Sequence, residues 1–420
     1  MIDLRLLRED LEGVRAAYAR LGGVKDLDRA VELDAEHRRL LAEVEQLRAD
    51  QNRSSKAIGK TSAEDRPAAI AEAKELSDRL KELEPKLEGS ADELKAAATG
   101  LPNFPHESVP EGHTEEDNVV EREVGDKPDF DFEPRTHSEL GESLGLFDSD
   151  RAVKTSGSRF VYLTGLGAIL ELALVRFAID FCNERGFKPV VPPVLVKEHA
   201  MYGTGFLPTE EHEFYKVERD DLYLVGTSEV PLAAMHADEI LSEESLPVRY
   251  AGFSPCFRRE AGSYGKDTKG LIRVHQFDKV EQFSFAHPDE SWDEYQSIRA
   301  NQERILQALE IPYRVLVMCT ADLSAAAAKK VDHEAWIPGE KRFLELTSAT
   351  NATDYQARRL QVRCRIGGET RLVHMLNGTA CAVGRTIVAL LENHQRADGG
   401  VDIPEALRPY TGFSEIPPGG

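Results

Sequence analysis

Two N-terminal stretches with a seven-residue repeat constrain the fold of this chain more than any other feature. Their seam positions are Leu33, His37, Leu40, Val44 and Leu47 in the first stretch, and Ala73, Leu76, Leu80, Leu83 and Leu87 in the second. Spacings of four and three residues place such positions along one side of a helix, which is the pattern of a coiled coil. The polar segment between the stretches contains Gly59 and Pro67, where the chain can turn back. The sequence therefore predicts an antiparallel two-helix coiled-coil arm over about residues 28–97.

The predicted arm has two local features. Pro85 lies inside the second helix, and because proline lacks a backbone N–H and clashes with the preceding turn, we expect a kink or a short break there. Near the turn, residues 51–62 carry Arg53, Lys56 and Lys60 and no acidic residue. Unopposed basic side chains suit a polyanionic partner, although a solvated turn can have the same composition.

Composition excludes several classes of protein. The chain has 420 residues, enough for two or three domains. It has no run of about 18 apolar residues, and its first residues are charged, so we expect neither a membrane span nor a secretory signal. Five cysteines without paired spacing favour a reducing, cytoplasmic location and argue against zinc. With a net charge of −22, any contact with nucleic acid must be local.

The chain divides into three predicted parts. Residues 1–100 should form an N-terminal domain that carries the arm, and residues 101–135 a linker rich in Pro, Gly and acidic residues. From residue 136 to 420, helical segments alternate with strand-like runs such as 249–260 and 271–285. Short spacers between these runs favour hairpins, so we predict an α+β domain whose mostly antiparallel sheet is flanked by helices.

One segment places many charged and aromatic residues between two of the strand-like runs. Residues 257–281 read FRREAGSYGKDTKGLIRVHQFDKVE, with a Gly-rich loop that contains two lysines. Arginines at fixed positions on paired strands can hold phosphate oxygens through bidentate hydrogen bonds. A surface ion pair would explain any single arginine, but several arginines around an aromatic side chain favour a phosphate site.

Three segments resemble the motifs of a known family. Residues 257–281 resemble motif 2 of the class II aminoacyl-tRNA synthetases, GFKPVVPPVLV resembles motif 1, and GTACAVGRTIVALLENHQ resembles motif 3. With the predicted arm, these segments make the chain similar over essentially its whole length to the bacterial-type seryl-tRNA synthetases. The resemblance implies the class II catalytic fold and a homodimer formed through motif 1.

The resemblance also implies an ATP site. Arg258 should hold the α-phosphate, Glu260 should accept from the adenine amino group, and Phe277 should stack on the adenine ring. Arg273, expected on the same strand as Phe277, should face the phosphates. Arg385, at the start of the last predicted helix, should cover the opposite side of the nucleotide. The three arginines are the implied catalytic residues, because they stabilise charge on the transferring phosphorus.

A strand over LELTSAT should line the nucleotide with Glu345 and Ser348. Glu345 is the implied ligand of Mg²⁺, an ion that favours one or two carboxylates together with substrate phosphates. The expected cofactors are therefore ATP and Mg²⁺, without zinc.

The same family pattern implies a serine pocket. Thr227 and Glu229 match its TxE signature near the amino group, and Glu281 matches the acid that binds the ammonium. Thr379 matches the reader of the side-chain hydroxyl, and Asn377 lies beside it. A substrate without the hydroxyl would leave buried polar groups unpaired, which predicts discrimination against alanine.

The implied reaction has two steps and needs no protein nucleophile. Serine is first activated as seryl-adenylate with release of pyrophosphate. It is then transferred to the 3′ end of tRNA(Ser), and the resemblance also admits tRNA(Sec) as an acceptor. In the family, the arm contacts tRNA, which makes Arg53, Lys56 and Lys60 the candidate contacts in this chain.

One segment departs from the family pattern. In TADLSAAAAKKVDHE, Ala321 and Ser324 stand where glycines are usual, and Val331 where an aromatic residue is usual. Two alternatives to a housekeeping enzyme therefore remain open: a specialised duplicate with a biosynthetic or inhibitor-resistance role, and a catalytically inactive RNA-binding homologue. An amino-acid:carrier-protein ligase would keep adenylation but would have no use for the arm.

Overall fold

The computed structural model describes residues 1–59, 62, 64–261 and 270–419. It divides into two compact units, Met1–Phe104 and Pro105–Gly420. In the described parts of both units, no helix has the length and apolarity that a membrane crossing requires. All five cysteines are buried and free.

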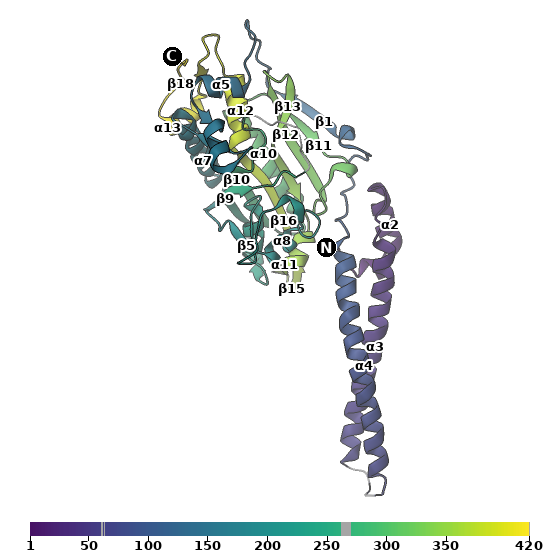
Figure 1. The fold of residues 1–420 in the computed structure, drawn as a ribbon. Coiled ribbons are helices and arrows are strands. Elements are labelled where there is room, and N and C mark those ends of the chain that lie inside the picture. Colours follow the sequence, from purple (N-terminus) through teal and green to yellow (C-terminus); the bar gives the residue numbers. More distant parts are fainter. Residues whose placement is uncertain (60–61, 63, 262–269, 420) are drawn as a thin grey trace. The chain divides into compact units, whose positions relative to one another are not determined.

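The first unit is a helical hairpin with a small helical base. Helices α3 (Leu27–Ile58) and α4 (Arg66–Thr99) run side by side (Figure 1). Their shared seam buries Val44, Leu47 and Leu80, as the seven-residue repeat predicts. Two shorter helices, α1 (Leu6–Glu9) and α2 (Leu11–Arg20), complete the base. The predicted antiparallel arm is confirmed.

The break expected at Pro85 does not occur, because α4 continues through this residue as one helix. Proline removes the hydrogen bond that the carbonyl of Lys81 would accept. Both Pro85 and Lys81 are exposed, so water can satisfy that carbonyl. Packing along the seam keeps the rest of the helix in place.

The second unit is built on an eight-stranded sheet. From one edge to the other its strands are β1 (Val119–Val124), β11 (Tyr313–Val317), β12 (Lys329–Ile337), β13 (Arg342–Asn351), β16 (His374–Ala382), β10 (Gln276–Ala286), β9 (Val248–Phe257) and β4 (Lys188–Val190). Every neighbouring pair is antiparallel except β4 and β9, which are parallel. The predicted α+β class with a mostly antiparallel sheet is confirmed.

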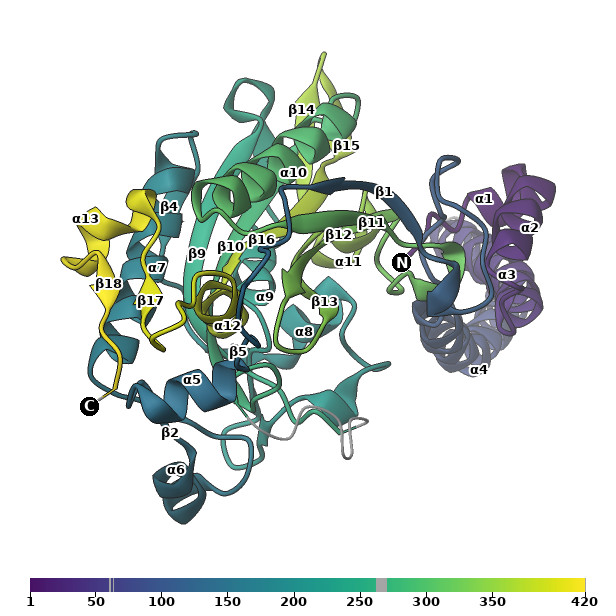
Figure 2. The same ribbon diagram turned by 90° about the horizontal axis from the view of Figure 1, so that it is seen from above.

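Three long helices, α7 (Leu166–Asn183), α10 (Ser291–Ala308) and α12 (Val383–Asn393), pack against this sheet in one hydrophobic core (Figure 2). The contact with α10 requires close approach, since a Cβ on Gly378 of β16 would lie 2.3 Å from a methyl carbon of Ile298. Because side chains alternate along a strand, the neighbours Asn377 and Thr379 point to the opposite face. That face carries the candidate site.

Shorter elements surround the sheet. The helices are α5 (His137–Ser143), α6 (Ser149–Ser156), α8 (Glu198–Thr204), α9 (Glu229–Ala234), α11 (Tyr355–Leu360) and α13 (Arg408–Thr411). The strands are β2 (Phe147–Asp148), β3 (Tyr162–Leu163), β5 (Leu195–Lys197), β6 (Lys216–Val217), β7 (Leu222–Leu224), β8 (Ile240–Ser242), β14 (Arg363–Ile366), β15 (Glu369–Leu372), β17 (Val401–Asp402) and β18 (Glu415–Ile416). Of these elements, α9 carries a candidate site residue.

The segment expected as a linker, 101–135, contributes an element to the sheet. Its strand β1 pairs with β11 at the edge of the sheet (Figure 2). Residues Val119–Val124 are nearly all exposed, and charged side chains on an edge strand discourage pairing with another chain. A strand without a buried face shows no apolar alternation, which is why the sequence reads as a linker.

Candidate active site

Two adjoining cavities open on the face of the sheet that Asn377 and Thr379 line. One, of about 440 Å³, is surrounded by the arginines of motifs 2 and 3, and the other, of about 460 Å³, by the residues expected to bind an amino acid. They share Phe206, Glu210, Thr227, Arg258 and Glu345. Cavities of this size and polarity are typical of small-ligand sites. We call them the nucleotide side and the amino-acid side.

On the nucleotide side, Arg258 directly follows β9. Its Nε donates to the carbonyl of Gly226 at 3.2 Å, and its guanidinium lies 5.4 Å from the centre of the Phe277 ring on the neighbouring strand β10. The hydrogen bond and the cation–π contact fix the orientation of the side chain while the other guanidinium nitrogens face the cavity. His275 supports this corner by hydrogen bonding the carbonyl of Arg258 at 2.9 Å through its Nδ1.

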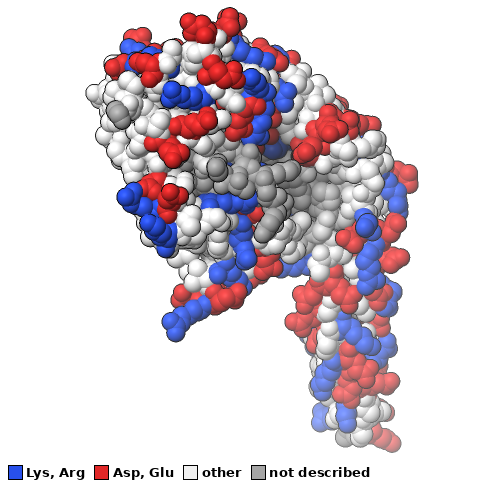
Figure 3. Space-filling view, turned by 45° about the horizontal axis from the view of Figure 1, so that its top comes forward, with Lys and Arg blue, Asp and Glu red and all other residues white. Residues whose placement is uncertain are grey.

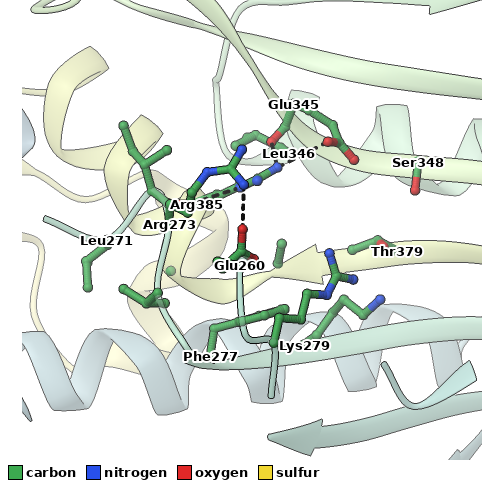
Figure 4. Close-up of a pocket in the computed structure, with 15 residues that line it drawn as sticks. Glu260, Leu271, Arg273, Phe277, Lys279, Glu345, Leu346, Ser348, Thr379 and Arg385 are labelled. Carbon is green, nitrogen blue, oxygen red and sulfur yellow. Dashed lines mark hydrogen bonds and ion pairs between the residues drawn. The ribbon is translucent and has the colours of Figure 1, made fainter. Parts of the chain in front are cut away.

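Glu260 and Arg273 face each other across the same cavity and form an ion pair (Figure 4). Arg273 does not lie on a strand as expected, because β10 begins only at Gln276. Arg273 instead lies in the irregular segment before Gln276, from which its side chain reaches Glu260. Glu260 has a φ of +52°, a conformation that is uncommon for a residue with a side chain and that often marks functional sites.

Arg385 lies in the first turn of α12 and reaches across to β13 (Figure 4). Its Nη1 donates to the carbonyl of Glu345 at 2.8 Å and to its carboxylate at 3.2 Å. Burial acts to raise the pKa of Glu345, but the positive charges of Lys330, Arg385 and Arg258 outweigh burial and lower that pKa to about 2. The Glu345 side chain is 40% exposed and lines the cavity. The site therefore contains an ionised carboxylate whose oxygens can bind a cation.

A β-bulge brings Glu345 and Ser348 to the same cavity although they are three residues apart. The pairing of β12 with β13 passes from His333–Thr347 to Glu334–Glu345 and skips Leu346. An extra residue in one strand reverses the facing of the residues beyond it. Both side chains consequently line the cavity, which strict alternation would not allow.

A second bulge shapes the amino-acid side. Along β10 and β16, the pairing passes from Val280–Cys381 to Glu281–Thr379 and skips Ala380. Thr379 donates its hydroxyl to Glu281 at 3.3 Å. Glu281 also forms a buried ion pair with Lys279 at 2.6 Å. The hydroxyl reader and the acid implied by the family pattern are therefore in direct contact.

Glu229 stands at the start of α9 on the opposite wall. One of its carboxylate oxygens accepts from Gln356 at 2.7 Å and from Asn377 at 3.0 Å. The buried Thr227 accepts from the backbone N–H of Glu229 at 3.2 Å, which orients the helix start. Burial and the nearby charge of Glu281 raise the pKa of Glu229 to about 7. Strand β7 ends at Leu224, so neither Thr227 nor Glu229 lies on a strand.

The cavities contain further residues that sequence reasoning missed. Lys279 contacts Glu281, and Gln356 contacts Glu229. Lys330 lines the same cavity, 3.1 Å from Asp332. Lys279 lies two residues before Glu281 on one strand face, so alternation could have found it. Gln356 sits in a short helix without a local signal.

The candidate tRNA contacts belong to the first unit. Arg53 forms an ion pair with Asp50 on α3, and Lys56 lies one turn farther along. Lys60 is outside the described residues. Acidic and basic side chains alternate over the visible face of the hairpin (Figure 3), so its surface is mixed rather than basic.

Comparison with known proteins decides the family. A model of the seryl-tRNA synthetase N-terminal domain matches residues 1–105, and a model of the class II tRNA synthetase core domain (G, H, P, S and T) matches residues 214–394. A serine–tRNA ligase of Thermobifida fusca is 50% identical over 420 residues, which are 100% of this chain and 99% of that protein. The chain belongs to the seryl-tRNA synthetase family. The serine–tRNA ligase of Nocardia farcinica is likewise 50% identical over the full length of both chains.

Solved structures of seryl-tRNA synthetases agree with this membership. The enzyme of Pyrococcus horikoshii complexed with ATP has a TM-score of 0.94 and 44% identity over 100% of both chains. The cytoplasmic serine–tRNA ligase of Naegleria fowleri in complex with AMP has a TM-score of 0.90 and 33% identity, covering 100% of this chain and 99% of that one.

The departures from the seryl-tRNA synthetase pattern do not strain the backbone. Neither Ala321 nor Ser324 has a positive φ, so a side chain is acceptable at both positions. Both line the amino-acid side of the site. Val331 is fully buried in β12, where it pairs with Val317 and Ala349.

Proposed function

We propose that this seryl-tRNA synthetase activates L-serine with ATP and transfers it to the 3′ end of tRNA(Ser). The observation that carries the proposal is the contact between Thr379 and Glu281 beside a cavity lined by Arg258, Arg273 and Arg385. A small polar pocket thus adjoins a phosphate-binding cavity on one sheet face. This is the arrangement that joining serine to the α-phosphate of ATP requires.

The nucleotide side has a group for each part of ATP. Phe277 lines a smaller adjoining cavity together with Glu260 and the three arginines, where it offers an aromatic face for the adenine ring. Glu260 offers an acceptor for the adenine amino group. Arg258 directly follows β9, whereas Arg385 lies in the first turn of α12, so the two arginines can hold phosphate oxygens from two directions. Arg273 exchanges its ion pair with Glu260 for contact with a phosphate.

On the amino-acid side, the ammonium of serine meets Glu281 and Glu229, with Thr227 orienting the latter. Thr379 and Asn377 lie where the serine hydroxyl can exchange hydrogen bonds with them. Alanine would fill the same space but would leave these polar groups unpaired, at a free-energy cost of about 1–3 kcal/mol.

The residues present also fit Mg²⁺. The Glu345 carboxylate and the Ser348 hydroxyl are hard oxygen donors on one strand face, and the low pKa of Glu345 keeps the carboxylate charged. When bound, the ion would neutralise negative charge on the phosphates of ATP.

In the first step, a carboxylate oxygen of serine forms a bond to the α-phosphorus, and the bond to pyrophosphate breaks. Arg258 stabilises the charge that develops on the α-phosphate oxygens. In the second step, a ribose hydroxyl of the tRNA end attacks the carbonyl carbon, the hydroxyl proton passes to a phosphate oxygen of the adenylate, and AMP leaves with the bond electrons. The protein contributes position and charge in both steps.

A homodimer completes the proposal. Ile169 and Leu172 on α7 and Val191 after β4 are 43%, 67% and 76% exposed, which is unusual for large apolar side chains. All three lie in or beside the motif 1 region. A second copy of the chain would cover these three side chains. We also propose a cytoplasmic location, where tRNA is available to the enzyme.

Serine-dependent exchange of labelled pyrophosphate into ATP tests the function directly. We expect exchange with serine and Mg²⁺ but not with alanine, and aminoacylation of tRNA(Ser) under the same conditions. Replacing Thr379→Val, which keeps the shape but removes the hydroxyl, should reduce the preference for serine over alanine by about 10–100-fold. Folded protein that binds tRNA but shows no exchange would instead be an inactive RNA-binding homologue.

A further inference from the structure

One wall of the amino-acid side is not part of the sheet. It is formed by consecutive residues of the segment between β11 and β12, namely Ala321, Asp322, Leu323, Ser324, Ala325 and Ala326. The segment contains only the short turn η4 (Thr320–Asp322) as regular structure. Strand pairing does not fix its position, so other contacts must do so.

Those contacts include the side chain of Asn118, which lies between the turn η1 (Glu115–Asp117) and β1. Its Oδ1 accepts from the backbone N–H of Cys319 at 2.8 Å, and its Nδ2 donates to the carboxylate of Asp322 at 2.7 Å. A backbone N–H can only donate, which fixes the orientation of the amide. One side chain thus holds both ends of the turn that begins the wall.

Thr320 provides a second attachment to the same upstream segment. Its backbone N–H donates to the carbonyl of Pro110 at 2.9 Å. Its hydroxyl accepts from the N–H of Gly112 at 3.1 Å and lies 3.2 Å from the carbonyl of Gly112. The approach is close, because a Cβ on Gly112 would lie 2.6 Å from the sulfur of Cys319.

We propose that Asn118 is a positioning residue for serine activation. Asn118 acts through Cys319 and Asp322 and holds the wall 321–326 against the bound amino acid. This role rests on the proposed function of the pocket. A wall held from behind restricts where serine can lie, so losing the attachment weakens serine binding. The nucleotide side depends on β9, β10 and α12, and its affinity for ATP is unaffected.

Exchanging the donor and the acceptor tests this role. In Asn118→Asp, the second carboxylate oxygen faces the carboxylate of Asp322, and the KM for serine in pyrophosphate exchange should rise about tenfold with the KM for ATP unchanged. Asp322→Asn alone keeps a carbonyl oxygen that can accept from Asn118. The serine KM of this single variant is the baseline for the double variant. The double variant restores one donor and one acceptor and should return the serine KM to within about threefold of that baseline.

Control variants separate positioning from folding. Asn52→Asp makes the same chemical change on an exposed part of α3 and should leave both KM values unchanged. Thr320→Val removes the hydrogen bonds of the hydroxyl with Gly112 and should again raise only the serine KM, which keeps the test valid if Asn118→Asp does not fold.

An unchanged serine KM in Asn118→Asp, an equal rise in both KM values, or a failure of the folded double variant to recover would overturn the proposal. Absence of serine-dependent exchange by the unaltered protein would refute the proposed function instead.

Discussion

The two carboxylates expected to bind the ammonium of serine, Glu229 and Glu281, have different partners. Lys279 pairs with Glu281 at 2.6 Å, whereas Glu229 accepts from the neutral amides of Gln356 and Asn377. Burial and the charge of Glu281 consequently raise the pKa of Glu229 to about 7. The ammonium of a bound amino acid would bring a positive charge to Glu229. The pocket is therefore arranged to bind a cation, and burying Glu229 without that charge lowers the stability of the ligand-free protein.

Replacing Glu229→Gln should therefore stabilise the ligand-free protein while removing its activity. The pKa of Glu229 is raised in the folded state, so its carboxyl ionises at a lower pH in the unfolded chain than in the folded protein. The folded state therefore loses stability as the pH rises from about 4.5 to 7. Glutamine keeps the acceptor for both amides and avoids this loss. We expect roughly 1 kcal/mol of added stability at pH 8, after allowance for water in the open pocket, and none at pH 4.

Thermal unfolding at the two pH values, together with pyrophosphate exchange, checks this prediction. Exchange should fall by about 100-fold or more. Glu218→Gln, the same change at an exposed position, serves as the control. A Glu229→Gln protein that is less stable at pH 8 would show that the carboxylate is not a source of strain.

Two bulges in the sheet, in the pairings of β12 with β13 and of β10 with β16, determine which side chains reach the site. Alternation along β13 would place Glu345 and Ser348 on opposite faces, and the skipped Leu346 brings them to the same one. Neither bulge is marked by glycine or proline, so the sequence pattern alone could not locate them. The resemblance to a family singled out these residues, whereas the physical reason for their juxtaposition needs the pairing register.

The continuity of α4 through Pro85 leads to a prediction for the arm. An internal proline costs a helix up to about 3 kcal/mol, and here that cost is offset by seam packing rather than by a break. Pro85→Ala restores the hydrogen bond to Lys81 and should stabilise α4 locally by about 1–3 kcal/mol. Amide hydrogen exchange of residues 81–89 in the full-length protein measures this gain.

A matched change at Glu82, which is exposed on the same helix, distinguishes the backbone effect from alanine's general helix propensity. Glu82→Ala should slow exchange by much less than Pro85→Ala. Equal protection in the two variants would mean that the proline is not a weak point of the arm.

The sequence predicted those parts of the fold whose apolar pattern repeats within a short stretch of chain. The repeat around Val44 and Leu80 identified the arm, because every apolar position recurs within one or two helical turns. Elements without such a signal were missed. Strand β12 buries Asp332 and His333, so it does not alternate as a half-buried strand should, and β1 buries almost nothing. Tertiary contacts define both strands.

The division into two units predicts that activation and tRNA charging can be separated. Residues that line the cavities all belong to the second unit, whereas Arg53 and Lys56 belong to the first. Replacing residues 49–75 with a short Gly- and Asn-containing turn removes both basic side chains. It keeps the seam around Val44 and the ion pair of Arg48 with Glu84 at 2.7 Å, so the shortened hairpin should fold.

We expect the shortened protein to keep serine-dependent pyrophosphate exchange within about twofold and to lose aminoacylation of tRNA(Ser) by about 100-fold in kcat/KM, a loss of roughly 2.7 kcal/mol. In the full-length chain, Arg53→Gln with Lys56→Gln should give a smaller loss of about tenfold, and the remaining activity should depend less on salt because fewer phosphates are contacted. Charging that survives removal of the distal arm would mean that the tRNA is held by the second unit alone. Loss of exchange as well would mean that the arm supports the catalytic fold rather than the tRNA.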